Sequence, residues 1–515
     1  MRKWLPLITV CLGTFMLLID VTIVNVALPD MAADLKTGFG SLQWVVDAYA
    51  LTLAALVLGT GSIADRVGHR RAYIAGLALF AAASFVCGIA PNSGALIAAR
   101  AVQGVGAAAM FATTFALLNS NYQGRDRGTA YGMWGAVAGA SAAVGPIIGG
   151  LLTEAVSWRW IFFVNLPVSV LAIVLCVTVL TDTHEPVHSR IDILGMALFT
   201  AAAGTLTYGL IKANEDGWAT PASWGCLIAS GVLVIVFVLV ERAIRQPMLD
   251  LELMRNRTFV GVLVAGLVLT MSAFSAFTYT SIWLQSVLGL SPIEAGLTGL
   301  PLSASAFIVS AAIGRFLHGS NSGPIIGGGM VLIGAGGIVC TLLVHGAASW
   351  PALVPGFVIM GVGVGLATPT LGSTAMAAVP MQRGGMAAGA VNTARQLGFA
   401  LGIAALGSVF ATRAATVLQD HGVPQSARVA KALAGGQAEY LLRAVPARFH
   451  DALDTALHAS AVSGLQWAFA VSGIAGLVFG AVCWRLISTP RTEPARESAA
   501  PRDTAPAQAQ AREFS

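Results

Sequence analysis

Charged side chains are scarce in this sequence. Of its 515 residues, 10% are Asp, Glu, Lys or Arg and 56% are hydrophobic, whereas a soluble domain usually carries about a quarter charged residues. The mean hydropathy is correspondingly high, at +0.77. This composition excludes an ordinary soluble protein. The net charge of +5 is therefore not evidence of nucleic-acid binding. It predicts an all-α polytopic membrane protein, because an open sheet edge cannot satisfy its backbone in lipid.

Paired cysteines, metal-ligand spacings and phosphate-binding loops are also missing. The six cysteines occur singly, each inside an apolar run, which is typical of small buried hydrophobes rather than redox or metal sites. No GxxxxGK[ST] motif occurs, so nothing indicates an ATP site. The sequence therefore predicts no metal and no cofactor.

The N-terminus lacks a small-residue cleavage site, and its apolar part, residues 6–29, is longer than the roughly 7–15 residues of a signal peptide. We expect a retained first spanning helix. A helix needs about 20 mainly apolar residues to cross the hydrocarbon, and fourteen segments qualify. They lie near 6–29, 43–62, 71–90, 95–118, 129–152, 160–181, 193–211, 223–240, 258–284, 293–314, 324–345, 351–373, 385–411 and 464–487. Twelve spans, with one adjacent pair misread, is the alternative.

The basic residues indicate the orientation of these spans. With the N-terminus in the cytoplasm, fourteen Lys and Arg residues fall on the cytoplasmic side, against three (Lys36, Arg159 and Lys212) in the short outer loops. Such a bias is typical of cytoplasmic loops. We therefore predict a multi-pass protein of the cytoplasmic (inner) membrane with both termini on the cytoplasmic side.

A weak internal echo suggests two related halves. Residues 127–150 and 383–407 each open with Arg-Gly and continue as Gly/Ala-rich helices, although small-residue packing alone produces such likeness. We predict a six-helix bundle at 1–181, a linker with two inserted helices at 182–257, and a second bundle at 258–489 with a long outer loop, 412–463. ARFHDALDTALHA in that loop favours a short helix on the outer surface, and the Pro/Ala-rich tail, 490–515, is predicted to be disordered.

The stretch GSIADRVGHRR, residues 61–71, follows the second span and combines glycines, an acid and several bases. Glycines permit close approach of helix ends. Asp65 can lie at a helix N-terminus or pair with an arginine, and arginines can bridge carbonyls at helix C-termini. We expect a latch that holds the cytoplasmic face shut in one conformation; charge that simply retains the loop inside is the alternative for the two final arginines. The predicted latch residues are Gly61, Asp65, Arg66, Gly68, Arg70 and Arg71.

Two charges lie deep in the first and fourth spans. Asp20 in IDVTIVNVALP is well inside the first span, and Arg100 in RAVQGVGAA shares a helix face with Gln103. Buried charges are costly unless they are paired, neutralised or hydrated. We expect Asp20 to pair with Arg100 and to exchange a proton when the pair separates. The alternatives are a structural carboxyl group and an arginine that extends to the outer interface.

Small residues dominate the fifth span, GMWGAVAGASAAVGPIIGG. Proline bends a helix, and glycines allow it to press against a helix of the other half. The residues of this span that carry the family resemblance given below are Gly132, Gly145, Pro146, Gly149 and Gly150. Generic packing of small residues is the alternative.

These four motifs, together with WRWIFFVN at 158–165, resemble those of the major facilitator superfamily, specifically its fourteen-helix drug:proton antiporters. The resemblance covers the chain to about residue 490; Ile63, His69 and Ser141 depart from the family pattern. It implies two pseudo-symmetric six-helix bundles plus two inserted helices, with alternating access. It also implies export of amphipathic drugs or toxic small molecules, with protons as coupling ion. It allows membrane-fusion and outer-membrane channel partners, but nothing in the sequence requires them.

Further intramembrane polar residues are candidates for the substrate cavity. Asp47, Gln103, Arg395 and Gln396 either contact substrate or stabilise an internal network, whereas Glu294 is expected to open a helix. A dedicated exporter of one metabolite or antibiotic is the nearest alternative function. A membrane enzyme is disfavoured because the loop histidines are dispersed, and a passive channel or sensor is disfavoured by Asp20 and the fifth-span motif.

Overall fold

The structure is a computed structural model that describes residues 2–487, except positions 38, 181–191, 216, 219, 245–246, 315–320, 347, 381–382 and 444. Regular structure within these residues is entirely helical. The predicted disordered tail, 490–515, lies outside the described residues.

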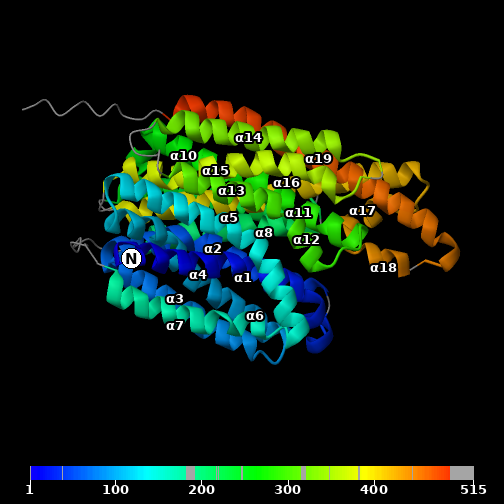
Figure 1. The fold of residues 1–515 in the computed structure, drawn as a ribbon, viewed down its shortest axis with the longest axis horizontal. Helices are drawn as coiled ribbons and strands as arrows, with labels where there is room; N and C mark the ends of the chain where they lie inside the picture. The colour runs from blue at the N-terminus through cyan, green and yellow to red at the C-terminus, as the bar shows by residue number, and fades with distance from the viewer. Residues whose placement is uncertain are drawn as a thin grey trace, which may run out of the picture.

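The first part of the chain forms one group of packed helices, here called the first bundle (Figure 1, blue to cyan). These segments are apolar around most of their circumference, as helices between lipid and protein must be. Their bounds are α1 Leu5–Leu35, α2 Phe39–Val67, α3 His69–Gly88, α4 Ser93–Asn121, α5 Gly124–Ala155, α6 Trp160–Phe163 and α7 Asn165–Val179.

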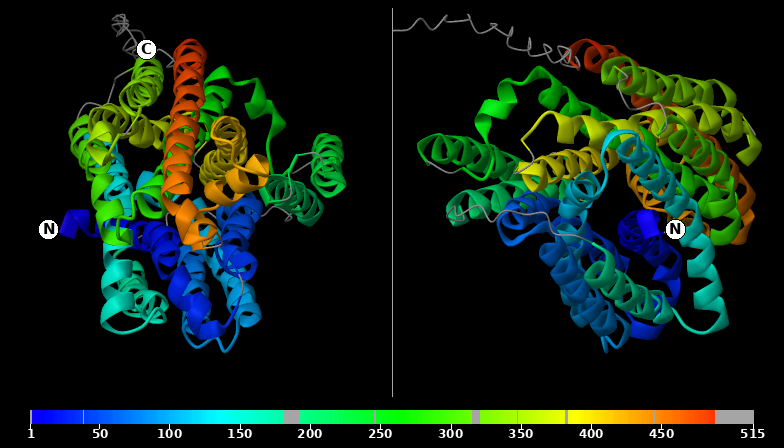
Figure 2. Two further views of the ribbon diagram at one scale, coloured as in Figure 1. Left: turned by 90° about the vertical axis from the view of Figure 1, so that its right-hand side faces the viewer. Right: turned by 60° about the vertical axis from the view of Figure 1, so that its left-hand side comes forward.

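Helices α8 (Ile193–Glu215) and α9 (Pro221–Ala243) pack against each other on the flank of the molecule (Figure 2). Helix α8 contacts both α2 of the first bundle and α16 (Gly384–Asp420) of the remaining helices. Helix α9 exposes large apolar side chains such as Val232, Ile235 and Leu239. In a bilayer these side chains are positioned to face acyl chains.

The helices from Leu251 to Leu486 form the second bundle (Figure 1, green to red). Its first span is unusual, because two π-helical turns, η3 and η4, interrupt it. The elements are η2 Leu251–Arg255, α10 Arg257–Leu269, η3 Thr270–Phe274, α11 Ser275–Ile282, η4 Trp283–Val287, α12 Pro292–Thr298, α13 Leu300–Ile313, α14 Ser322–Leu343, η5 Trp350–Leu353, α15 Val354–Ala377, α16 as above, α17 Ser426–Ala434, α18 Ala438–Arg443, η7 Ala447–Phe449 and α19 His450–Leu486.

Twelve helices among the described residues are long and apolar enough to cross a membrane. Two of the fourteen predicted spans are not among them. The segment 129–152 lies within α5, and the segment 293–314 is divided between α12 and the 14-residue α13. Gly299 and Pro301 stand at that division. Proline is tolerated in the first turn of a helix but not in its interior, so a new helix, α13, begins there. The described residues therefore hold twelve candidate spans.

The outer segment 412–463 differs from its prediction as a loop with one surface helix. Helix α16 continues to Asp420. The ARFHDALDTALHA stretch forms η7 and the first turns of α19, which runs without a break from His450 to Leu486. The short surface helices are instead α17 and α18, at the end of the molecule opposite the N-terminus (Figure 1).

Candidate functional site

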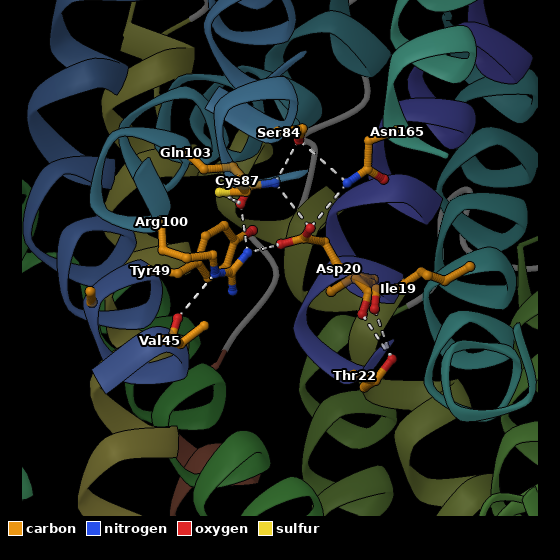
Figure 3. Close-up of polar contacts among 12 residues, drawn as sticks. Ile19, Asp20, Thr22, Val45, Tyr49, Ser84, Cys87, Arg100, Gln103 and Asn165 are labelled. Atoms are coloured by element: carbon orange, nitrogen blue, oxygen red, sulfur yellow. Dashed lines mark hydrogen bonds and ion pairs between the residues drawn. The ribbon is translucent and has the colours of Figure 1, made fainter. Parts of the chain in front are cut away.

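Asp20, in the middle of α1, is surrounded by hydrogen-bond donors inside the first bundle (Figure 3). Its Oδ2 lies 2.5 Å from Nη1 of Arg100 on α4. Its Oδ1 accepts hydrogen bonds from Nε2 of Gln103 at 3.0 Å and from Nδ2 of Asn165, the first residue of α7, at 3.1 Å. Both amides also donate to Oγ of Ser84 on α3, at 2.7 and 3.4 Å. These side chains, together with Arg100, form what we call the Asp20 cluster.

Arg100 has anchors that do not depend on Asp20. Its Nε donates to the Val45 carbonyl of α2 at 3.0 Å, and its Nη1 donates to Oε1 of Gln103 at 2.7 Å. The guanidinium also lies over the Tyr49 ring, 4.2 Å from the centroid. Arginine would therefore keep partners on α2 and α4 if the carboxyl group of Asp20 became neutral.

The Asp20 cluster is closed to solvent in this conformation. Asp20 and Gln103 have no exposed surface, and Arg100 is 1% exposed. Removing two charges from water costs several kcal/mol per ion, and this cost is offset only when the remaining polar atoms are also hydrogen-bonded. The cluster meets that condition, because both carboxylate oxygens of Asp20 accept hydrogen bonds.

The predicted pair of Asp20 and Arg100 is thus present, but the structure places Gln103 in the same cluster instead of an exposed cavity. Sequence reasoning missed Ser84 and Asn165. Asn165 ends the WRWIFFVN stretch, which contributed only to the family resemblance. Its position at the start of an apolar run was the available signal, because a polar side chain there needs a partner.

Asp65 bridges the two bundles at the face where α1 begins, here called the N-terminal face (left in Figure 1). Its carboxylate accepts backbone N–H bonds from Gly385 at 2.5 Å and from Met386 at 2.7 Å, in the first turn of α16. The residue before α16, Arg383, provides no side-chain cap of its own. Asp65 therefore serves as an N-cap supplied by the opposite bundle, with favourable alignment to the helix dipole.

Gly61 provides the close approach that this cap needs. A Cβ at Gly61 would collide with the backbone carbonyl of Gly385, and a Cβ at Gly389 would lie 3.0 Å from the carbonyl oxygen of Val57. Helices α2 and α16 therefore cross almost backbone to backbone. Any side chain at Gly61 would force the helices apart.

Two of the other predicted latch residues, Gly68 and Arg70, act within the first bundle. Gly68 has φ of +103° between α2 and α3, a conformation that favours glycine, so its role is the turn. Arg70 donates to the Val177 carbonyl at 2.6 Å, near the C-terminus of α7. Arg66 is partly buried at the end of α2, and Arg71 is exposed on α3.

The glycines of α5 form a second contact between the bundles. Ser310 Oγ on α13 donates to the Gly132 carbonyl at 2.9 Å, and a Cβ at Gly132 would lie 2.5 Å from the Ser310 carbonyl oxygen. Gly150 faces Ile293 of the second bundle, whereas Gly145 faces Thr22 of its own bundle. Gly149 is buried, and the side chain of Pro146 lies outside the described residues.

The remaining candidates do not join the Asp20 cluster. Asp47 lies on α2 with a partly exposed side chain, and Arg395 and Gln396 lie on α16, also partly exposed. Glu294 closes a capping box with Ser291 at the start of α12, which confirms its prediction as a helix-opening residue. No group of three or more His, Cys, Asp or Glu side chains suited to a metal occurs in the described part of the chain.

Comparisons with known proteins agree on one family. The Major Facilitator Superfamily model matches residues 10–403. The chain is 35% identical over 426 residues to the multidrug resistance protein Stp of Mycobacterium tuberculosis, which covers 81% of this chain and 78% of that protein. It is 35% identical over 433 residues to the puromycin resistance protein pur8 of Streptomyces alboniger, covering 83% and 86%. It is 31% identical over 508 residues to a tetracenomycin C resistance and export protein of Streptomyces glaucescens, covering 96% and 93%.

Among solved structures, the human organic anion transporter MFSD10 (TETRAN) has a similar fold. The TM-score is 0.60 at 12% sequence identity, and the alignment covers 94% of this chain and 99% of that one. At this identity the likeness concerns the fold alone.

Proposed function

Because the chain belongs to the major facilitator superfamily, we propose that it is a proton-coupled exporter of amphipathic drugs or toxic small molecules. The chain is an efflux transporter of the multidrug and antibiotic-resistance type, and it is not an enzyme. Export coupled to protons, the site residues and the orientation in the membrane are the proposed parts.

The proposed architecture has fourteen spans: two pseudo-symmetric six-helix bundles and the inserted pair α8–α9. Helix α5 and the α12–α13 pair supply the two spans beyond the twelve. Both termini are proposed to be cytoplasmic, on the strength of the excess of Lys and Arg at the N-terminal face. The conformation with the Asp65 cap in place is then the one closed toward the cytoplasm.

The Asp20 cluster carries the proposal of proton coupling. With its donors in place, the carboxylate is stabilised in the charged form; once they move away, a buried carboxyl group favours the neutral form. A proton is therefore taken up in one conformation and released in the other. Asp20 holds the proton, and Arg100 is proposed to remain on its own anchors during the exchange.

Helix α2 links this cluster to the cap between the bundles. Val45 and Tyr49 contact Arg100, and Gly61 and Asp65 contact α16. Twenty residues of helix separate Val45 from Asp65, or about 30 Å at 1.5 Å per residue. If α2 tilts together with Arg100 when Asp20 is released, Asp65 would be lifted from α16 and the cytoplasmic face would open.

The proton gradient supplies enough free energy for this task. One proton moving down 100 mV releases about 2.3 kcal/mol, and one pH unit adds about 1.4 kcal/mol. The sum, about 3.7 kcal/mol, supports a concentration ratio of several hundred for a neutral substrate.

The test is dye efflux from proteoliposomes under an imposed pH gradient, with wild type, Asp20→Asn and a control, Asp126→Asn. Asp126 forms an exposed pair with Lys3 at 2.8 Å, within the first bundle. We expect Asp20→Asn to insert normally but to lose gradient-driven efflux, and the control to keep it. Gradient-driven efflux by Asp20→Asn at the wild-type rate would refute the role given to Asp20.

A dedicated exporter of one antibiotic is a second candidate, because two of the relatives carry the names of single antibiotics, puromycin and tetracenomycin C. A panel of structurally unrelated dyes and antibiotics separates the two functions. Efflux of several unrelated compounds indicates a multidrug exporter, and efflux of one compound indicates the dedicated form.

A further inference from the structure

Arg395 lies in the middle of a membrane-crossing helix. Eleven residues separate it from Gly384, where α16 begins, which places it about 16 Å along the helix axis. A guanidinium at this depth is costly unless it has a counter-charge, backbone acceptors or water. Its contacts therefore indicate what it is for.

Hydroxyl groups of the neighbouring span donate hydrogen bonds to the backbone of α16 at and after Arg395. Thr270 Oγ1, at the start of the π-turn η3, donates to the Arg395 carbonyl at 2.6 Å. Ser275 and Tyr279 donate to the carbonyls of Phe399 and Ile403, one and two turns further along α16. The π-turn adds the extra residue that places Thr270 and Ser275 on the same face.

Gly266 on α10 leaves space for the Arg395 side chain, because a Cβ at this position would lie 3.3 Å from Arg395 Cγ. The guanidinium then points toward the first bundle, with its Cζ 5.9 Å from the centroid of the Phe111 ring on α4. One turn earlier, Asn392 Nδ2 donates to the Phe111 carbonyl at 2.9 Å. Arg395 therefore lies beside a contact between the two bundles, where an alternating-access transporter binds its cargo.

A counter-charge is missing at this position. Among the described residues, no carboxylate lies within ion-pair distance of Arg395 and no acceptor receives a hydrogen bond from its guanidinium. Its side chain is also partly exposed. Arg100 is the opposite case, since it is fully buried and bonded to Asp20, Gln103 and the Val45 carbonyl. One cation is neutralised within the protein, and the other keeps its donors available.

We propose that Arg395 binds an acidic group, such as a carboxylate, sulfonate or phenolate, on an aromatic compound that the protein exports. The Phe111 ring provides an apolar surface beside the guanidinium, and five N–H donors in a planar fork match an oxyanion. This inference rests on the proposed function and narrows its substrates to a class that includes organic anions.

The binding experiment uses three probes with the same fluorophore: dansylglycine, which carries a carboxylate, dansylamide, which is neutral, and dansylcadaverine, which is cationic. Their affinities are measured by fluorescence anisotropy with the full-length protein in nanodiscs. The variants are Arg395→Gln, Arg395→Lys and the control Arg413→Gln. Arg413 is an exposed arginine on the same helix, stacked 3.8 Å from the Trp467 ring centroid.

For Arg395→Gln we expect the Kd of dansylglycine to rise by about tenfold or more relative to that of dansylamide, because a hydrogen-bonded charge partner is lost. Arg395→Lys keeps the charge and should recover part of the difference, and Arg413→Gln should leave the ratio unchanged. Failure of wild type to bind dansylglycine would overturn the proposal. An equal loss of all three probes in Arg395→Gln would also overturn it and indicate a structural role.

A transport arm separates this inference from the proposed function. Wild-type proteoliposomes are given each probe under an imposed pH gradient. Binding of dansylglycine through Arg395 without gradient-driven movement of any probe would contradict proton-coupled export and leave the anion site standing. Movement of dansylamide with no Arg395-dependent preference for dansylglycine would support export and refute the anion site.

Discussion

Removal of the Asp65 carboxylate should shift the conformational equilibrium of the transporter, because this group caps α16 from the opposite bundle. Two backbone N–H groups donate to it at 2.5 and 2.7 Å, and the residue is 8% exposed. A hydrogen bond to a charged group contributes about 1.5–3 kcal/mol, but in the open conformation water replaces these partners. A net bias of about 2–3 kcal/mol for the pair corresponds to about a 30- to 150-fold change in the equilibrium between the conformations.

The assay is a distance measurement by electron–electron double resonance across the N-terminal face. Spin labels go on Val67 and Glu252, exposed positions on α2 and η2, in a variant without native cysteines. We expect Asp65→Ala to move the population from short to long distances, and Asp65→Asn, which retains one acceptor oxygen, to move it less. Asp126→Ala removes an exposed pair worth at most about 1 kcal/mol and serves as control. Identical distance distributions for wild type and Asp65→Ala would refute the cap.

Three further predictions concern separate contacts. Gly132→Val should lower efflux at least about tenfold, because a Cβ at this position would lie 2.5 Å from a backbone oxygen of α13. The control Gly225→Ala should leave efflux unchanged, because no atom lies within 4 Å of a Cβ at Gly225. Asn165→Leu removes a donor to the buried carboxylate, worth about 1.5–3 kcal/mol, and should slow gradient-driven dye efflux about tenfold or more; an unchanged rate would contradict its place in the cluster. The Arg159 hydrogen bond holds the pKa of Asp34 below its ordinary value. The thermal stability that Asp34 adds over an Asp34→Asn variant should therefore be present at neutral pH and lost as pH falls through that lowered pKa; a difference that persists at all pH values would contradict this.

The sequence predicted the features that follow from the energetics of lipid. Long apolar runs identified most spans, because an unpaired backbone is so costly in hydrocarbon that little besides a helix is allowed. The same cost predicted that Asp20 and Arg100 would need each other. Glu294 was placed correctly because an acidic side chain is favoured in the first turn of a helix, at the positive end of its dipole.

Contacts between distant segments could not be predicted in the same way. Nothing in the sequence near Asp65 indicates that its partner is the first turn of α16, 320 positions away, and the choice between a helix terminus and an arginine stayed open. Gln103 was assigned to a cavity because helical spacing gives a face but not the neighbour of that face. The α19 helix was cut short because hydropathy marks the membrane boundary and carries no information about helices that extend beyond it.

The most direct test of the account is proton release on substrate binding. Detergent-solubilised protein in weakly buffered solution receives a dye that the proteoliposome assay has shown to be exported, and a pH indicator records the protons released. The account predicts release by wild type and by Asp126→Asn, and none by Asp20→Asn when the dye still binds. Release of the same number of protons by Asp20→Asn would contradict the claim that this carboxyl group carries the coupled proton.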